Sequence, residues 1–184
     1  MAMAENFAKT RALEELGAFV TSSLTEDVVI CYRLEHEELI VSVKPSTIIK
    51  TLKFLRDDPN CLFKQLIDIC AVDYPNEDER FELNYNLLSL IHNVRIRLKI
   101  RIHDKSPIQS STDVFSSANW WEREVWDMFG ISFSNHPDLR RLLTDYGFEG
   151  HPLRKDFPLT GYVEVRYDQE TKRVIYEPVQ LQQE

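Results

Sequence analysis

Two neighbouring segments in the middle of the chain alternate strictly between apolar and polar residues. Over residues 81–87 every second residue is apolar, and over residues 94–102 five apolar residues alternate with four cations. Such alternation is typical of β-strands with one buried and one polar face. A slip of one residue would bury the four cations, so the register of the pair is strongly constrained. With His92-Asn93 as a two-residue turn, the predicted partners are Leu87 with Leu98, Tyr85 with Ile100, Leu83 with Ile102, and Glu82 with His103.

Apolar spacing elsewhere in the chain predicts three helices. The first covers residues 6–23. The second begins at Pro45, a residue that a first helical turn accepts, and ends at Asp57. The third contains all three tryptophans, with Ser117 as its N-cap and Gly130 as its stop.

The remaining predicted strands lie on either side of the second helix. Residues 62–74 begin with helical spacing and continue as an apolar run before Pro75, which predicts a short helix that passes into a strand. Residues 28–34 and 39–43 predict a hairpin with a turn near His36 and Glu37. Its predicted cross-strand pairs are Ile30 with Val43, Tyr32 with Val41, and Leu34 with Leu39.

These elements predict an α+β fold with a core domain over residues 1–135 and an extended C-terminal arm over residues 136–184. In the arm the periodicity vanishes and Gly and Pro become frequent, while large apolar residues recur at regular intervals. Ordering the backbone costs ~1 to 2 kcal/mol per residue, so an arm without internal ladders must lie against something. We expect it to contact both its own core and another subunit.

Composition excludes several classes of protein. The formal net charge of −8 has the wrong sign for general binding to a phosphate backbone. Even the apolar run over residues 62–74 contains three charges, so no segment is apolar enough over the length of a membrane span. The acidic and basic residues near the N-terminus match neither a secretory signal nor a transit peptide. The three cysteines lack a disulfide, zinc or iron–sulfur spacing and are expected to be reduced thiols in the core.

The cationic face of the strand at 94–102 has more than one interpretation. Residues 94–105 hold five cations and one anion, in a chain whose net charge is −8. The face is either a solvated surface paired with Glu82 and other local carboxylates, or a docking stripe for an acidic partner. A nucleic-acid platform would need aromatic residues among the cations, whereas Phe81 and Tyr85 point to the apolar side.

Candidate catalytic groups are few. Glu124 and Asp127 stand three residues apart on the predicted third helix, a spacing that suits acid–base chemistry or a metal. A di-metal site would add a Glu-x-x-His motif from another helix, which this sequence lacks. Charges beside tryptophan are costly to bury alone. We therefore expect the helix carboxylates to pair with cations of the arm, namely Arg140, Arg141, Arg154 and Lys155.

Two further motifs are weak. His136 and His151 lack a third metal ligand, so a structural role is favoured for both. The GxxG motif at 147–150 lies in the irregular arm, not between two helices as in an RNA-binding KH domain.

The third helix and the arm resemble a known family. Residues 120–131 read WWEREVWDMFGI, HPDLRR follows at 136–141, and TDYGFEGHPLRKDFPL occupies 144–159. The likeness extends to 161–168, and upstream to 68–75 and 85–89, so that it covers about residues 61–178. These strings resemble the signature of the thirty-kilodalton subunit of respiratory complex I, NADH:quinone oxidoreductase.

The resemblance implies an α/β sandwich with a mixed or antiparallel sheet and flanking helices, in the peripheral arm of the proton-translocating complex. The subunit would be non-catalytic and would hold no metal or cofactor, while NADH, FMN, iron–sulfur clusters and quinone would be used by other subunits. Its C-terminal arm would pack on the large quinone-site subunit near iron–sulfur subunits, with indirect membrane contact and no nucleic acid. The implied partner-binding or structural residues are Glu122, Arg123, Glu124, Asp127, His136, Arg140, Arg141, Tyr146, His151, Arg154, Lys155, Asp156, Phe157, Arg166 and Tyr167.

The amino-acid sequence of the arm is most similar to the form of the subunit that is encoded in mitochondrial genomes. This implies a peripheral location on the matrix side of the mitochondrial inner membrane, and it would explain the missing presequence. The alternative is the cytoplasmic face of an alphaproteobacterial membrane. Alternative functions are the equivalent subunit of a membrane-bound hydrogenase or ferredoxin-driven complex and, more distantly, an RNA-binding module. Many relatives continue into an aromatic-rich tail, whose contacts we expect to be lost or replaced here.

Overall fold

A five-stranded mixed sheet forms the centre of the computed structural model, which describes residues 2–25 and 27–180, with the backbone alone for residues 2–9. Its strand order is β1-β2-β5-β4-β3, in which β2 and β5 run parallel and all other neighbours run antiparallel. The strands are β1 (Val29–Glu35), β2 (Glu38–Val43), β3 (Gln65–Asp73), β4 (Phe81–Ser89) and β5 (Val94–Ile102). The predicted α+β class and mixed sheet are confirmed.

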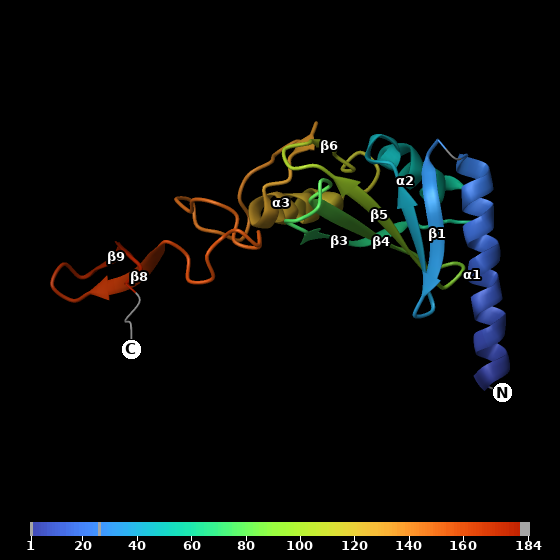
Figure 1. Cartoon of the computed structure of the whole chain (residues 1–184), viewed down its shortest axis with the longest axis horizontal. Helices are drawn as coiled ribbons and strands as arrows, with labels where there is room; N and C mark the ends of the chain where they lie inside the picture. The colour runs from blue at the N-terminus through green and yellow to red at the C-terminus, as the bar shows by residue number, and fades with distance from the viewer. Residues whose placement is uncertain (1, 26, 181–184) are drawn as a thin grey trace.

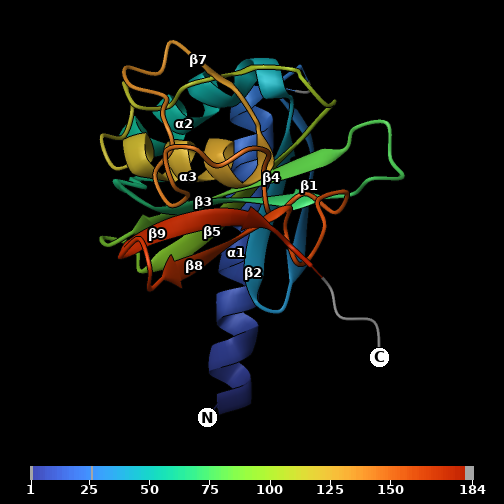
Figure 2. The same ribbon diagram turned by 90° about the vertical axis from the view of Figure 1, so that its left-hand side faces the viewer.

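Three α-helices complete the body. They are α1 (Ala2–Leu24), α2 (Ile48–Asp57), which follows a 3-10 turn over Pro45–Thr47, and α3 (Ala118–Phe129). Side chains of all three helices join one apolar core with Leu39, Tyr85 and Leu98 of the sheet. At Gly17 the helix α1 lies so close to the sheet that an added Cβ would be 2.5 Å from the Tyr32 ring. The N-terminal part of α1 continues past the β1–β2 turn (Figures 1 and 2).

The register of β4 and β5 differs from the predicted one by two residues. Leu87 pairs with Ile96, Tyr85 with Leu98, and Glu82 with Arg101, because the connection is a four-residue turn over 90–93 and not the dipeptide His92-Asn93. A shift of two residues keeps every side chain on its predicted face. The cations of β5 therefore still lie on the polar side of the sheet.

Three smaller predictions about the sheet and its cysteines were wrong. Residues 62–70 form no helix: β3 begins at Gln65, and an irregularity between Leu66 and Asp68 breaks its alternation and imitates helical spacing. In the first hairpin Val43 pairs with Val29 and not with Ile30, because a bulge shifts the register there. Of the cysteines only Cys61 is buried, whereas Cys31 and Cys70 are exposed.

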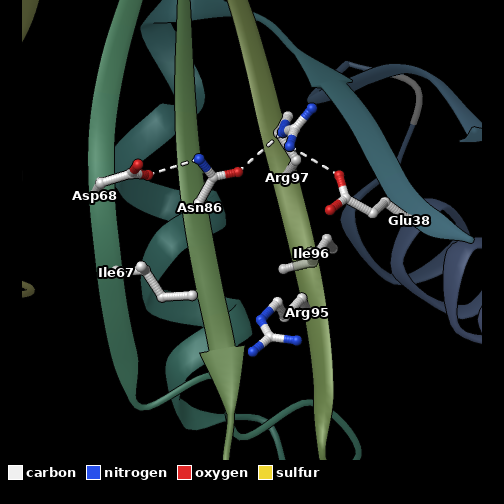
Figure 3. Close-up of a pocket in the computed structure, with 7 residues that line it drawn as sticks. All are labelled: Glu38, Ile67, Asp68, Asn86, Arg95, Ile96 and Arg97. Carbon is white, nitrogen blue, oxygen red and sulfur yellow. Dashed lines mark hydrogen bonds and ion pairs between the residues drawn. The ribbon is translucent and has the colours of Figure 1, made fainter. Parts of the chain in front are cut away.

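The cations of β5 are largely paired within the sheet. Arg97 donates to Asn86 Oδ1 at 2.9 Å and bridges Glu38 at 2.8 Å, while Asn86 donates to Asp68 at 2.6 Å. This row of contacts, which we call the polar ladder, crosses four strands (Figure 3). Nearby, Glu82 accepts hydrogen bonds from Lys99 and Arg101. The middle of the face is thus a surface paired with local carboxylates, as one of the two interpretations predicts.

The C-terminal arm leaves the body beyond two short parallel strands, β6 (Ile108–Gln109) and β7 (Phe133–Ser134). It ends in a hairpin of β8 (Val163–Asp168) and β9 (Arg173–Pro178), which is held away from the sheet (Figure 1). The expectation of an arm without internal ladders is therefore wrong at its end. The division into domains at residues 135 and 136 stays a prediction.

Candidate subunit interface

Helix α3 is the element on which the arm is built. Its apolar side chains Val125, Met128 and Phe129 are buried, and Gly130 ends it in the left-handed conformation with φ of 77°. Ser117 stands at the N-cap as predicted, but its hydroxyl donates to the Leu66 carbonyl at 3.5 Å and does not cap the helix. Both predicted ends of the helix are confirmed.

Asp127, a fully buried residue on α3, binds the first turn of the arm, residues 141–144. Its Oδ2 accepts hydrogen bonds from the backbone N–H groups of Leu142, Leu143 and Thr144 at 2.8–3.1 Å. Its Oδ1 accepts from the Thr144 hydroxyl at 2.6 Å and from Arg141 at 2.8 Å. Burial alone would raise the pKa of Asp127, but these donors outweigh it and hold the pKa well below the usual range. The predicted pairing of this carboxylate with a cation of the arm is present in the structure.

The other two carboxylates of α3 do not pair with cations of the arm. Glu122 is fully buried and accepts from the Ser110 and Ser111 hydroxyls, both at 2.6 Å, and from the Ser111 N–H at 2.7 Å. The ring nitrogen of His136 lies 4.0 Å from it. Burial raises the pKa of Glu122, and the serine hydrogen bonds oppose this only in part. Glu124 is half-buried and has no polar partner among the residues that the structure describes.

Other predicted residues also hold the arm to α3. Arg123 is buried and donates to the carbonyl oxygens of Arg140 and Arg141 at 3.1 and 2.9 Å. His151 Nδ1 donates to the Asp127 carbonyl at 2.9 Å, and its ring packs against Gly130 so closely that a Cβ there would lie 2.6 Å away. His136 bonds the Asn119 carbonyl at 3.0 Å. The arm is therefore fixed by backbone contacts as well as by charges.

A second anchor joins the arm to the edge of the sheet. Asp73 at the end of β3 accepts from Arg80 at 2.6 and 2.8 Å and from the backbone N–H of Lys155 at 2.7 Å. The hydrogen bonds from Arg80 lower the pKa of Asp73 and, on the arm side, that of Asp156 as well. Arg154 of the arm also belongs to this cluster, because it forms an ion pair with Asp104 at 2.8 Å.

Sequence reasoning missed Asp73, Arg80 and Asp104 in this anchor, as well as the two serines around Glu122. Asp73 lies in the string at 68–75 that resembles the family, and this was the one available signal. The contact of Asp73 with Lys155 spans 82 positions, so no local spacing could have shown it.

Several predicted residues point away from these anchors. Tyr146 is fully exposed, and the Lys155 side chain is exposed although its N–H is bound. Among the described residues the Arg140 side chain pairs with the neighbouring Asp138, and Phe157 packs between the rings of Phe148 and Tyr162. The arm thus has an inner side bound to the body and an outer side that is free.

The terminal hairpin has one apolar face, and a second face on which Ile175 lies among charged residues. On the apolar face Val163 pairs with Pro178, Val165 with Tyr176, and Tyr167 with Val174. The five valine and tyrosine side chains of this face are 55–63% exposed. On the second face Arg166 pairs with Glu177 at 2.9 Å. An isolated two-stranded ribbon is marginally stable in water. Exposed apolar patches mark interaction sites, so we expect a partner to cover this face.

In the described part of the chain, no group of three or more His, Cys, Asp or Glu side chains could hold a metal ion. In the same residues, no helix has the length and apolar character needed to span a membrane.

Comparisons with known proteins agree on one family. The family model described as the 30 kDa subunit of respiratory-chain NADH dehydrogenase matches residues 41–163. An NADH-quinone oxidoreductase subunit of Paramagnetospirillum magneticum is 57% identical over 95% of this chain and 88% of its own length. The protein of the same name from Rhodospirillum rubrum is 59% identical over 96% of this chain and 82% of its own length.

A solved structure has a similar fold. A chain in the structure of the membrane-bound sulfane sulfur reductase, an archaeal respiratory membrane complex, matches with a TM-score of 0.68 and 26% identity. The match covers 79% of this chain and 85% of the archaeal one.

Proposed function

Because this chain belongs to the family of the 30 kDa subunit of respiratory-chain NADH dehydrogenase, we propose that it is a non-catalytic assembly subunit of NADH-quinone oxidoreductase. That it is a subunit of the peripheral arm of this complex follows from the family and from relatives 57–59% identical. The finer proposal is that its C-terminal arm binds the large quinone-site subunit beside the iron–sulfur subunits. Electrons would then pass through cofactors of those neighbours.

One observation carries the proposal, the exposed apolar face of the β8–β9 hairpin. Two anchors fix the arm where it leaves α3 and the sheet, while the β8–β9 hairpin lies away from the sheet and the helices that the structure describes (Figure 1). Five large apolar side chains on one face would bury a substantial area against a partner. A protein surface of this kind marks an interaction site.

The chemistry of the anchors supports a structural role. Of the two carboxylates that the sequence first suggested for catalysis, Asp127 is used within the chain, whereas Glu124 has no polar partner among the described residues. Asp127 accepts five hydrogen bonds, which engage all its lone pairs, and the neighbouring Glu122 accepts three. A carboxylate whose lone pairs are all engaged in holding backbone is poorly placed to exchange protons with a substrate.

The location of the complex is also a proposal. Both bacterial relatives favour a membrane-associated bacterial complex. A location on the matrix side of the mitochondrial inner membrane, which the amino-acid sequence of the arm implies, stays a prediction. The comparisons favour neither the hydrogenase-type alternative nor the RNA-binding one.

The test is to disrupt the apolar face of the hairpin and to measure assembly and turnover separately. Val165→Lys and Tyr176→Lys each place a cation on the apolar face, and Ile175→Lys is the control on the opposite face. Membranes of cells that carry each variant are solubilised mildly and resolved on native gels. The tagged chain and the NADH:quinone reductase activity are then measured in each band.

We expect the two apolar-face variants to reduce the assembled complex by roughly tenfold or more, because lysine cannot be buried there unpaired. The control should assemble normally, and turnover per assembled complex should stay unchanged in all three variants. Normal assembly with lost turnover would instead indicate a catalytic role. A wild-type chain found only in a small, inactive, soluble band would contradict the assignment to the complex.

A further inference from the structure

The polar face of the sheet changes character near the β4–β5 turn. Along the polar ladder each charged side chain has a partner. At the turn, Arg95 forms no hydrogen bond or ion pair with any side chain of residues 10–25 or 27–180, the part of the chain whose side chains the structure describes. Leu90 and Ile91, in the turn whose His92 and Asn93 line a hollow with Arg95, are each 70% exposed. An unpaired cation and two exposed aliphatic side chains therefore belong to the same end of the sheet.

The acidic residues that line a hollow with Arg95 are Glu38 and Asp68 in one hollow and Glu37 and Glu38 in the other, and none of them is without a partner. Glu38 and Asp68 line the same hollow as Arg95, but Glu38 is bound by Arg97 at 2.8 Å and Asp68 by Asn86 at 2.6 Å. Figure 3 shows these contacts above Arg95, which lies next to Ile67 with no contact drawn to it. The Arg95 guanidinium is therefore available to an anionic group from outside the chain.

The surface around Arg95 is concave on both sides. A hollow of about 150 Å³ lies on the open face between Ile67, Ile96 and Arg95. A second hollow of about 500 Å³ lies between α1, the β1–β2 turn and the β4–β5 turn. Ala12, Leu13 and Val94 form its apolar part, and its polar part is formed by His36, Glu37, Glu38, His92, Asn93 and Arg95. A cation between two partly apolar hollows suits a carboxylate flanked by apolar side chains.

We propose that Leu90, Ile91, Arg95 and Ile67, which we call the turn patch, form a second docking surface. Its occupant is a segment of a neighbouring subunit that presents an Asp or Glu side chain between apolar residues. Arginine is enriched among binding hot spots, and exposed apolar side chains near it add apolar area to a docking surface. This inference rests on the proposed function, because it needs the chain to be in a multi-subunit assembly.

The position of the turn patch gives it a distinct role. The β4–β5 turn lies beside α1, at the end of the molecule away from the β8–β9 hairpin (Figure 1). The turn patch and the hairpin therefore cannot bind the same small epitope. The chain would bridge two contact regions, with the hairpin in one and the sheet end in the other.

The experiment is photo-crosslinking within the intact complex. A benzophenone amino acid replaces Leu90 in one tagged chain and Tyr176 in another, and Lys53, an exposed residue of α2 outside both surfaces, is the control position. After irradiation of membranes, the crosslinked subunit and peptide are identified by mass spectrometry. The Leu90 probe is repeated with Arg95→Glu and, as a matched charge reversal, with Lys53→Glu.

We expect the Leu90 probe to capture one other subunit at a peptide that contains Asp or Glu among apolar residues. Arg95→Glu should lower the yield by roughly tenfold through like-charge repulsion, whereas Lys53→Glu should leave it unchanged. No product from Leu90, or a yield that Arg95→Glu does not change, would overturn the inference while a product from Tyr176 keeps the proposed function. If neither probe gives a product and the chain does not migrate with the complex, the proposed function itself fails.

Discussion

Replacing Asp127 by asparagine removes one charge and leaves the shape of the side chain unchanged. The amide can still accept the three backbone N–H groups of Leu142, Leu143 and Thr144 through one oxygen. Its NH₂ group then faces Arg141, a donor that needs an acceptor. Asp127→Asn therefore leaves a partly buried guanidinium without its counter-charge.

The magnitude follows from the burial of the two partners. Breaking a buried ion pair costs about 3 to 5 kcal/mol. Because the Arg141 side chain is 21% exposed and can reach water, we expect a lower value of about 2 to 3 kcal/mol. This is roughly a 30- to 150-fold change in the opening equilibrium of the first turn of the arm.

The assay is hydrogen exchange of the Leu142, Leu143 and Thr144 amides in the purified full-length chain. In Asp127→Asn these amides should exchange faster by the factor just given, since local opening exposes them. Glu124→Gln is the matched control, because it removes the same charge from the same helix at a position with no polar partner in the described residues. Unchanged protection in Asp127→Asn, or equal loss in the control, would refute the reasoning.

Three further predictions concern stability, each measured by urea unfolding followed through tryptophan fluorescence. Gly130→Ala should lower the free energy of unfolding by about 1 to 3 kcal/mol, because position 130 has a left-handed φ and an added Cβ would clash with the His151 ring. Gly147→Ala, with no atom near the added Cβ, should stay within about 0.5 kcal/mol of wild type. Tyr85→Phe should be neutral or stabilising, because the buried hydroxyl has no partner in the described structure, and a loss above about 1 kcal/mol would contradict this. Asp73 and Asp127 have lowered pKa values when folded, so unfolding takes up protons and stability should fall as the pH drops below about 4. Asp127→Asn should flatten that fall, and a pH profile identical to wild type would contradict its role.

Local sequence signals predicted the elements that local interactions determine. Helix α3 and its stop at Gly130 were predicted because apolar spacing and a glycine in the left-handed conformation act within a few residues. The pairings of Tyr32 with Val41 and of Leu34 with Leu39 were predicted for the same reason. The register of β4 with β5 was not, because turns of two and four residues place the same side chains on the same faces.

In the candidate site, even fewer contacts could be predicted from local sequence signals. The pairing of Asp127 with Arg141 could be predicted, since both lie in the region where a charged helix face precedes a cationic arm. The serines that satisfy Glu122 and the contact of Asp73 with the arm could not, because each depends on which elements the fold brings together. The hairpin at residues 163–178 was missed although residues 163–168 alternate, because the glycines and prolines before it indicated irregular structure.

The single parallel contact in the sheet has a consequence for how the chain is made. During synthesis β1 and β2 emerge first, yet β2 must wait for β5, which starts about fifty residues later, before its second edge is paired. Until then the apolar residues Leu39 and Val41 lie on an open strand edge, and such edges promote aggregation. Helix α1 packs on β1 and β2 and is complete before either strand. It can therefore cover the apolar face of the first hairpin and shield the nascent chain until the rest of the sheet has been translated.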